Sequence, residues 1–158
     1  MLKRTARMVA ALMLIGGGAL AGQDDIILDV TGDITDGTAK LDREALQKLP
    51  QVTLETSTVV TDGTHSFTGF LMRDLLDRLG AQGELVIASA LNDYVVEIPM
   101  SDFSEFDVIV AYRMDGKPLQ RDDKGPLWIV YPRDQHEALQ DIRYDYRWVW
   151  QLSRLEVQ

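Results

Sequence analysis

The 158-residue chain contains no cysteine and only two histidines, His65 and His136. The absence of cysteine excludes disulfide bonds, thiolate metal ligands and a cysteine nucleophile. Two histidines without a His-x-x-x-His spacing argue against a zinc site. No serine lies in a Gly-x-Ser-x-Gly elbow, and no glycine-rich phosphate loop is present. The sequence therefore predicts no catalytic residue and no metal ligand, and packing alone must stabilise the fold.

Basic residues are also scarce in this chain. It has 16 Lys and Arg against 25 Asp and Glu, which gives a formal net charge of −9 at pH 7. Nucleic acids and anionic membranes are bound through positively charged protein surface. The excess of acidic residues therefore argues against either of them as a partner.

Long apolar runs are missing except near the N-terminus. Lys3, Arg4 and Arg7 form a basic segment, residues 8–15 form an apolar run, and residues 19–21 supply a small-x-small pattern. This order is typical of a secretory signal peptide. The alternative is a retained membrane anchor, but the apolar run is shorter than the roughly 20 residues that a membrane span needs.

We therefore expect cleavage after Ala21, which makes residues 1–21 a signal peptide and residues 22–158 the folded domain. Cleavage would leave thirteen basic against 25 acidic residues, a net charge of −12. The expected location is the periplasm. A mature chain of this size is long enough for one domain with its own core.

The remainder of the chain consists of short segments with strand or helix patterns. Helices are predicted at Asp42–Leu49 and Leu71–Leu79, with a single helical turn at Met100–Phe106. The predicted strands are Ile26–Val30, Gln51–Val60, a short strand through Phe67 and Phe70, Leu85–Ala90, Tyr94–Ile98, Val108–Tyr112, Leu127–Tyr131 and Tyr144–Val157. We therefore expect a single α+β domain with many short strands and few helices.

Aromatic residues concentrate in the C-terminal part, where all three tryptophans lie: Trp128, Trp148 and Trp150. Each ring could pack in the core or offer its face to a planar ligand. Tyr131, which ends a predicted strand, leaves the same two alternatives open.

Polar residues at two corners are further candidates for ligand binding. Asn92-Asp93-Tyr94 lies between two predicted strands, where it could be a plain turn or a recognition corner. A carboxylate there can accept two parallel hydrogen bonds from adjacent N–H groups of a ring edge. Asp123 precedes a predicted strand and Arg133 follows it, so Arg133 could lie at a pocket mouth or in a surface ion pair.

Four blocks of sequence resemble the sulfite-oxidase-type molybdopterin domain. They are residues 68–76, 109–119, 125–132 and 147–148, and the most specific is the Ala-Tyr-x-Met-x-Gly-x-Pro-Leu pattern of residues 111–119. The resemblance covers most of the mature chain. It implies the mixed sulfite-oxidase fold, with a pterin pocket between sheet and loops.

The chain departs from this family at the positions that hold the cofactor. The resemblance places the family's metal-binding Cys at Thr56-Ser57-Thr58, which offers only hydroxyl groups. The family's phosphate-gripping His-Gly-Phe-Pro-Leu-Arg corresponds to residues 123–128, with Asp123 for the His and Trp128 for the Arg. The family's Lys before Trp is Arg147. These exchanges imply that the molybdenum cofactor, with its metal and phosphate, is not bound, whereas a free pterin has neither group.

Residues 91–99 and 124–132 resemble the periplasmic pterin-binding regulators (PruR-like), which bind reduced pterins and control membrane enzymes that make or break cyclic di-GMP. The resemblance implies a non-enzymatic protein that binds a reduced pterin and docks on the periplasmic sensor domain of a diguanylate cyclase or phosphodiesterase. Asp93 would hold the amino–imino edge of the ring, Asn92 would assist, and Trp128 would stack on the ring. The further candidates for the pocket are Tyr94, Tyr131 and Arg147, followed by Asp123, Arg133 and Trp148.

Two other functions remain open from the sequence. One is an oxidoreductase that binds molybdopterin without a Cys ligand. The other is a periplasmic adaptor without a ligand, in which the aromatic C-terminal segment is a protein interface.

Overall fold

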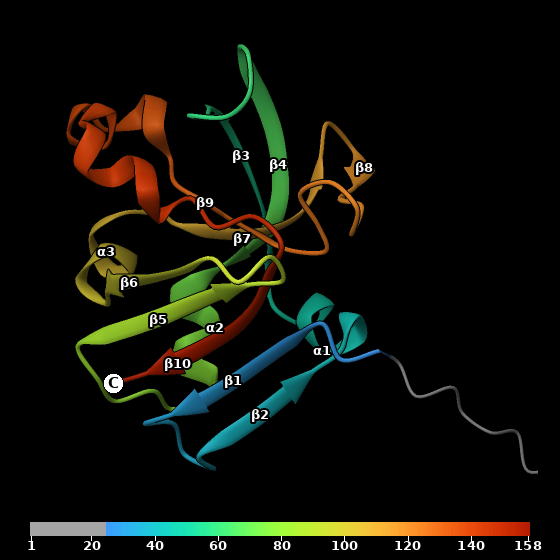
Figure 1. Cartoon of the computed structure of the whole chain (residues 1–158), viewed down its shortest axis with the longest axis vertical. Coiled ribbons are helices and arrows are strands. Elements are labelled where there is room, and N and C mark those ends of the chain that lie inside the picture. The colour runs from blue at the N-terminus through green and yellow to red at the C-terminus, as the bar shows by residue number, and fades with distance from the viewer. Residues whose placement is uncertain (1–24) are drawn as a thin grey trace, which may run out of the picture.

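The computed structural model describes residues 25–158, which form a sheet-rich domain with few helices (Figure 1). The predicted signal peptide lies outside the described residues. Within residues 25–158, no helix has both the length and the apolar character needed to cross a membrane.

The first sheet has five strands in the order β2-β1-β10-β5-β6. These strands are β2 (Thr38–Leu41), β1 (Leu28–Gly32), β10 (Leu152–Val157), β5 (Leu85–Ala90) and β6 (Val95–Pro99). β1 pairs with β10 in parallel, and the other neighbours are antiparallel. The strand nearest the C-terminus therefore lies in the middle of this sheet.

The second sheet is antiparallel and is built around β7. Its strands are β3 (Gln51–Ser57), β4 (Thr64–Leu71), β7 (Ile109–Met114), β8 (Lys117–Pro118) and β9 (Trp128–Val130). β7 pairs with β4, β8 and β9. Gly69 lies where the β4–β7 register shifts, and a Cβ atom there would come 2.0 Å from the carbonyl oxygen of Val110. The close approach of these two strands therefore requires a glycine.

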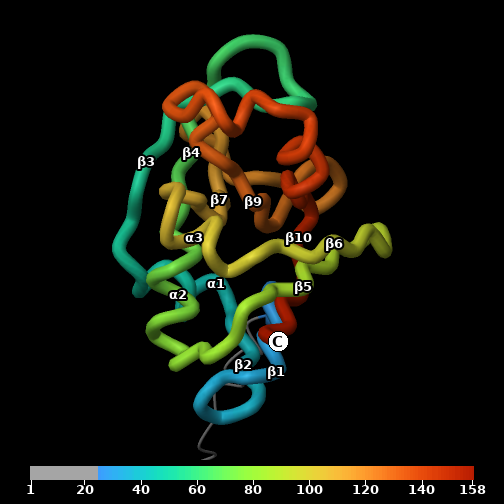
Figure 2. The backbone as a smooth tube through the Cα atoms, turned by 90° about the vertical axis from the view of Figure 1, so that its left-hand side faces the viewer, coloured from blue at the N-terminus to red at the C-terminus, as the bar shows by residue number. Residues whose placement is uncertain are grey.

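Helical segments are short and lie between the strands. They are α1 (Arg43–Gln47), α2 (Met72–Arg78), α3 (Ser101–Glu105) and the 3-10 helices η1 (Arg133–Gln135), η2 (Glu137–Gln140) and η3 (Ile142–Arg147). The Asp42 side chain caps α1 by accepting a hydrogen bond from the Ala45 N–H at 2.7 Å. The three 3-10 helices and the β3–β4 loop lie at the same end of the molecule in Figures 1 and 2.

One hydrophobic core unites the two sheets. Leu28 and Leu155 come from the first sheet, Phe67 and Ile129 from the second, and all four are fully buried. Side chains of α2, including Leu75, join the same cluster. The prediction of a single mixed domain is therefore confirmed.

Most predicted elements are present, and β5 has the predicted bounds, but the C-terminal segment differs. The strand predicted at Tyr144–Val157 is wrong in its first half, because the chain forms η3 and β10 begins only at Leu152. The Asp141 side chain caps η3 by accepting a hydrogen bond from the Arg143 N–H at 2.9 Å. This local bond favours a helical turn over an extended strand. The short strand β2 was not predicted.

Candidate ligand pocket

A small pocket with aromatic walls lies where three distant segments of the chain meet. Its volume is about 240 Å³. The residues that line it, called the aromatic pocket below, are Val59, Val60, Asn92, Tyr94, Asp145, Tyr146, Trp148 and Trp150. They come from the β3–β4 loop, the β5–β6 turn and the segment that contains η3 and leads to β10. Concave apolar pockets with a few polar groups are the usual form of small-molecule sites.

The β5–β6 turn is tied to η3 by a hydrogen bond across the pocket wall. The Tyr94 hydroxyl donates to the carbonyl oxygen of Tyr146 at 2.6 Å. Burial raises the pKa of Tyr94, so the phenol keeps its proton at neutral pH. Within the turn, the Tyr94 N–H donates to Asn92 Oδ1 at 3.2 Å. These bonds hold Asn92 and Tyr94 beside the aromatic segment.

A hydrogen-bonded network around the buried Asp102 side chain holds the end of η3 in place. Arg147 Nη1 donates to Asp102 Oδ2 at 2.5 Å, and the Tyr131 hydroxyl donates to the same oxygen at 2.7 Å. The Arg147 guanidinium also lies over the Tyr144 ring, 4.6 Å from its centroid. Burial opposes the charge of Arg147, but the hydrogen bonds to Asp102 and Tyr146 and the charge of Asp102 together outweigh burial and raise the pKa of Arg147. Burial, followed by the adjacent Asp102, raises the pKa of Tyr131 well above its usual value.

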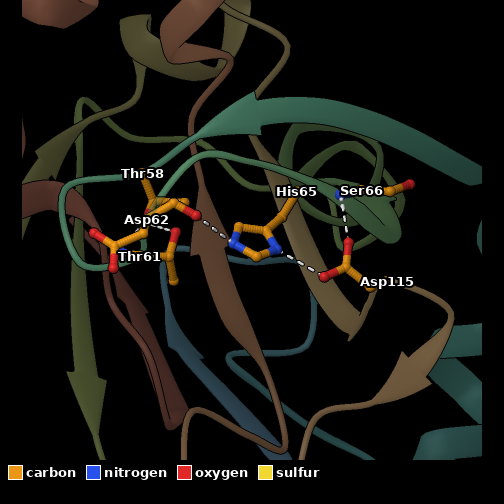
Figure 3. A network of polar contacts seen from close by, with 6 residues as sticks. All are labelled: Thr58, Thr61, Asp62, His65, Ser66 and Asp115. Carbon is orange, nitrogen blue, oxygen red and sulfur yellow. Dashed lines mark hydrogen bonds and ion pairs between the residues drawn. The ribbon is translucent and has the colours of Figure 1, made fainter.

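The β3–β4 loop is held by a clasp centred on His65 (Figure 3). His65 Nδ1 lies 2.7 Å from the Asp115 carboxylate, and Nε2 lies 3.0 Å from the carbonyl oxygen of Asp62. Both partners are acceptors, so both bonds form only when the ring is the doubly protonated imidazolium. The hydrogen bond to Asp115 raises the pKa of His65 and lowers the pKa of Asp115.

The His65 clasp gives stability a defined pH dependence. Because the pKa of His65 is raised above 6.5, its contribution is complete below that value and is lost as pH rises through the raised pKa. Because the pKa of Asp115 is lowered below 3.8, its contribution is complete above that value and is lost as pH falls through the lowered pKa. We therefore expect the melting temperature to fall from pH 6 to pH 8, and His65→Gln to flatten this slope.

The measurement is thermal unfolding followed by circular dichroism between pH 5 and pH 9. His136→Gln is the matched control, because His136 is the only other histidine of the chain and packs edge-on against Phe106 at 5.0 Å. An unchanged slope in His65→Gln would contradict the role of the clasp.

The structure brings three of the predicted site residues together. Asn92, Tyr94 and Trp148 all line the aromatic pocket. Asp93 does not, because its backbone adopts φ of 66° and its side chain lines a separate depression with Ser89 and Arg154. Asp93 therefore lies outside the aromatic pocket, although its sequence neighbours Asn92 and Tyr94 line it.

The predicted stacking role of Trp128 is wrong in this structure. Trp128 is 0% exposed, and its ring meets Phe67 edge-on at a centroid distance of 5.3 Å. All three residues of β9 are buried, so the strand offers no ring face to a ligand. Trp128 and Asp93 consequently do not share a cleft.

The other predicted site residues lie outside the lining of the aromatic pocket. Tyr131 is 0% exposed and, with Arg147, belongs to the network around Asp102, so neither lines the aromatic pocket. Asp123 pairs with Lys124 at 2.8 Å in a neighbouring depression that shares Val60 and Trp150 with the pocket. Arg133 lies in η1, away from the pocket lining.

Five residues of the pocket were not among the predicted site residues: Val59, Val60, Asp145, Tyr146 and Trp150. Tyr146, Trp148 and Trp150 alternate along the chain, within the segment Tyr144–Val157 that the sequence pattern predicted to be a strand. Because η3 ends at Arg147, the three side chains do not form one face of a strand and instead line the aromatic pocket. The valines carry no sequence signal for ligand binding, because only the loop geometry brings them to the pocket.

Within residues 56–58, the segment expected to hold the family's metal-binding Cys, Ser57 is engaged in other bonds. Ser57 Oγ donates to Asp134 Oδ1 at 2.5 Å, and the Ser57 N–H donates to Oδ2 at 2.6 Å. These bonds lower the pKa of Asp134, which keeps a negative carboxylate at this place. Among the described residues no group of three His, Cys, Asp or Glu side chains is placed to hold a metal. Hydroxyl groups satisfied by a carboxylate do not fit a thiolate-bound molybdenum.

Residues 21–157 match the oxidoreductase molybdopterin binding domain, and the chain belongs to this family. The sheet-rich single domain with few helices is the sulfite-oxidase-type molybdopterin-binding fold that the sequence resemblance implies. Among curated proteins, none matches the chain.

Proposed function

We propose that the protein is a non-enzymatic, periplasmic pterin-binding protein. It would report the presence of a reduced pterin to the periplasmic sensor domain of a membrane diguanylate cyclase or phosphodiesterase. The observation that carries this proposal is the aromatic pocket, which lies in a member of the molybdopterin-binding family whose expected Cys segment, residues 56–58, offers only hydroxyl groups.

The size and the walls of the pocket suit a bare bicyclic ring. Sites for drug-sized ligands usually measure about 300–1,000 Å³, and this one measures about 240 Å³. Trp148 and Trp150 provide aromatic walls, against which a flat heterocycle packs in stacked or edge-on geometry. A larger cofactor with a phosphate tail would need positive charge, and no Lys or Arg among residues 25–158 lines the pocket.

The hydrogen bonds between Ser57 and Asp134 argue against the alternative of a molybdopterin-dependent oxidoreductase. A carboxylate already satisfies the hydroxyl and the N–H of Ser57, so the anionic sulfur and oxygen ligands of a molybdenum centre would meet negative charge there. Metal analysis of the protein purified from a periplasmic fraction tests this point. Stoichiometric molybdenum would support the oxidoreductase and contradict our proposal.

The relay role is supported by exposed apolar side chains on the segments that form the pocket. Val95 is 57% exposed on β6, and Ile142 is 79% exposed on η3. Exposed apolar side chains are available for contact with a protein partner. A partner that contacts these segments would sense the ordering of the pocket by a ligand. The same residues would serve an adaptor without a ligand, so ligand binding decides between the two.

Trp150→Ala is expected to weaken binding of a reduced pterin at least tenfold without unfolding the domain. The residue is half-buried in the pocket wall, and the substitution removes one aromatic face, a loss of about 1.4 kcal/mol for each factor of ten. Isothermal titration calorimetry with a tetrahydropterin under anaerobic conditions measures the affinity. Ile142→Ala is the control, because this side chain is exposed and does not line the pocket. Absence of any heat with the unmodified protein would refute pterin binding.

A further inference from the structure

The aromatic pocket contains one charged side chain, Asp145, among the residues that line it. Within residues 25–158 no ion pair engages Asp145, and its Oδ1 is buried without a hydrogen-bond partner. A buried carboxylate oxygen without a donor costs free energy. A ligand that brings N–H groups to this wall would recover that cost.

Two unused donors accompany the carboxylate in the same pocket. Trp148 Nε1 is buried without a partner. Asn92 Oδ1 accepts from the Tyr94 N–H, and the Asn92 amino group makes no hydrogen bond to the described residues. The pocket therefore combines a carboxylate acceptor with N–H donors between aromatic rings. Such a set matches a heterocycle that has adjacent N–H groups on one edge and a carbonyl oxygen next to them.

We infer that Asp145 recognises the 2-amino-4-oxo edge of the bound ring and makes the pocket selective for pterins over pteridines that lack the 2-amino group. The N3–H and the 2-amino group would donate in parallel to the two carboxylate oxygens, a geometry that adds both strength and selectivity. The 4-oxo group would accept from Asn92 or Trp148. This inference rests on the proposed binding of a pterin in the aromatic pocket.

The other carboxylates near the pocket are placed differently. Asp93 lines the depression with Ser89 and Arg154, and Asp123 is paired with Lys124. Asp93 was the residue predicted from sequence for this edge of the ring. The structure assigns the role to Asp145, because within the described part of the chain it is the one carboxylate in the wall that also contains Trp148 and Trp150.

The test compares two ligands and two matched variants by titration calorimetry. The ligands are pterin and lumazine, which differ at position 2, where lumazine has an oxo group in place of the amino group. The variants are Asp145→Asn and Asp93→Asn, which both replace a carboxylate by an amide of nearly the same shape. We expect the unmodified protein and Asp93→Asn to bind pterin at least tenfold more tightly than lumazine. Asp145→Asn should lose at least tenfold in affinity for pterin and retain its affinity for lumazine.

The possible failures are distinguishable. If the unmodified protein binds pterin and lumazine equally, the ring-binding pocket stands and the role of Asp145 is refuted, whether or not Asp145→Asn folds. A preference for pterin that survives in Asp145→Asn refutes that role as well. If neither pterin nor lumazine binds the unmodified protein, the inference fails, and the titration with a tetrahydropterin decides whether the proposed function fails with it.

Discussion

Trp128→Ala is expected to lower the free energy of unfolding by about 3–5 kcal/mol, the range for truncating a large aromatic side chain in a core. Trp128 is fully buried in β9 and packs edge-on against Phe67. Its removal would leave a cavity between strands that other elements hold in place, so the surroundings could collapse only in part. A substantial fraction of the stability of a domain of this size would be lost.

Urea denaturation followed by circular dichroism measures this effect, with Trp150→Ala as the matched control. Trp150 is only partly buried at the rim of the core, so its truncation should cost clearly less stability while it weakens ligand binding. The two substitutions thus separate a core tryptophan from a pocket tryptophan. Equal stability of the two variants would show that Trp128 does not have the buried position described above.

Asp102→Ala is expected to cost about 3–5 kcal/mol, because it leaves the buried end of an ion pair without its partner. The side chains of Arg147 and Asp102 are 14% and 6% exposed, and Asp102 also accepts the Tyr131 hydroxyl. Loss of the carboxylate would leave a guanidinium and a phenol without their acceptor. Since Arg147 ends η3, the pocket wall formed by Tyr146 and Trp148 should loosen as well.

Asp107→Ala is the control for this prediction. Asp107 binds Arg73 at 2.6 Å, but the two side chains are 64% and 38% exposed. Exposed pairs of this kind contribute about 0–1 kcal/mol. Chemical denaturation of both variants gives the comparison, and a similar loss in each would argue that the network around Asp102 does not anchor η3.

The elements of the fold could be predicted because their patterns are local. The apolar stripe of α2 and the alternation in β3 and β5 each reflect one face turned to the core. The family resemblance added the mixed sulfite-oxidase fold, which no local pattern contains, whereas the division of the strands into two sheets was not predicted. The 3-10 helices were missed because a few capping bonds, such as that of Asp141, decide between a helical turn and a strand.

The candidate site could be predicted only in part. The corner at Asn92 and Tyr94 and the ring of Trp148 were found, since corners and aromatic clusters leave a trace in the sequence. The direction of each side chain was not predictable. Asp93 and Asp145 are both acids beside aromatic residues, and only the backbone geometry turns one away from the pocket and the other into its wall. The burial of Trp128 was likewise not predictable, because it depends on the pairing of β9 with β7.

The placement of β10 has a consequence for how the chain reaches its native state. This strand lies between β1 and β5, so the first sheet has a gap at its centre until residues 152–157 have left the ribosome. Contacts that join the two ends of a chain form late and slowly. The nascent polypeptide should therefore keep this sheet open until residues 152–157 have been synthesised and inserted between β1 and β5.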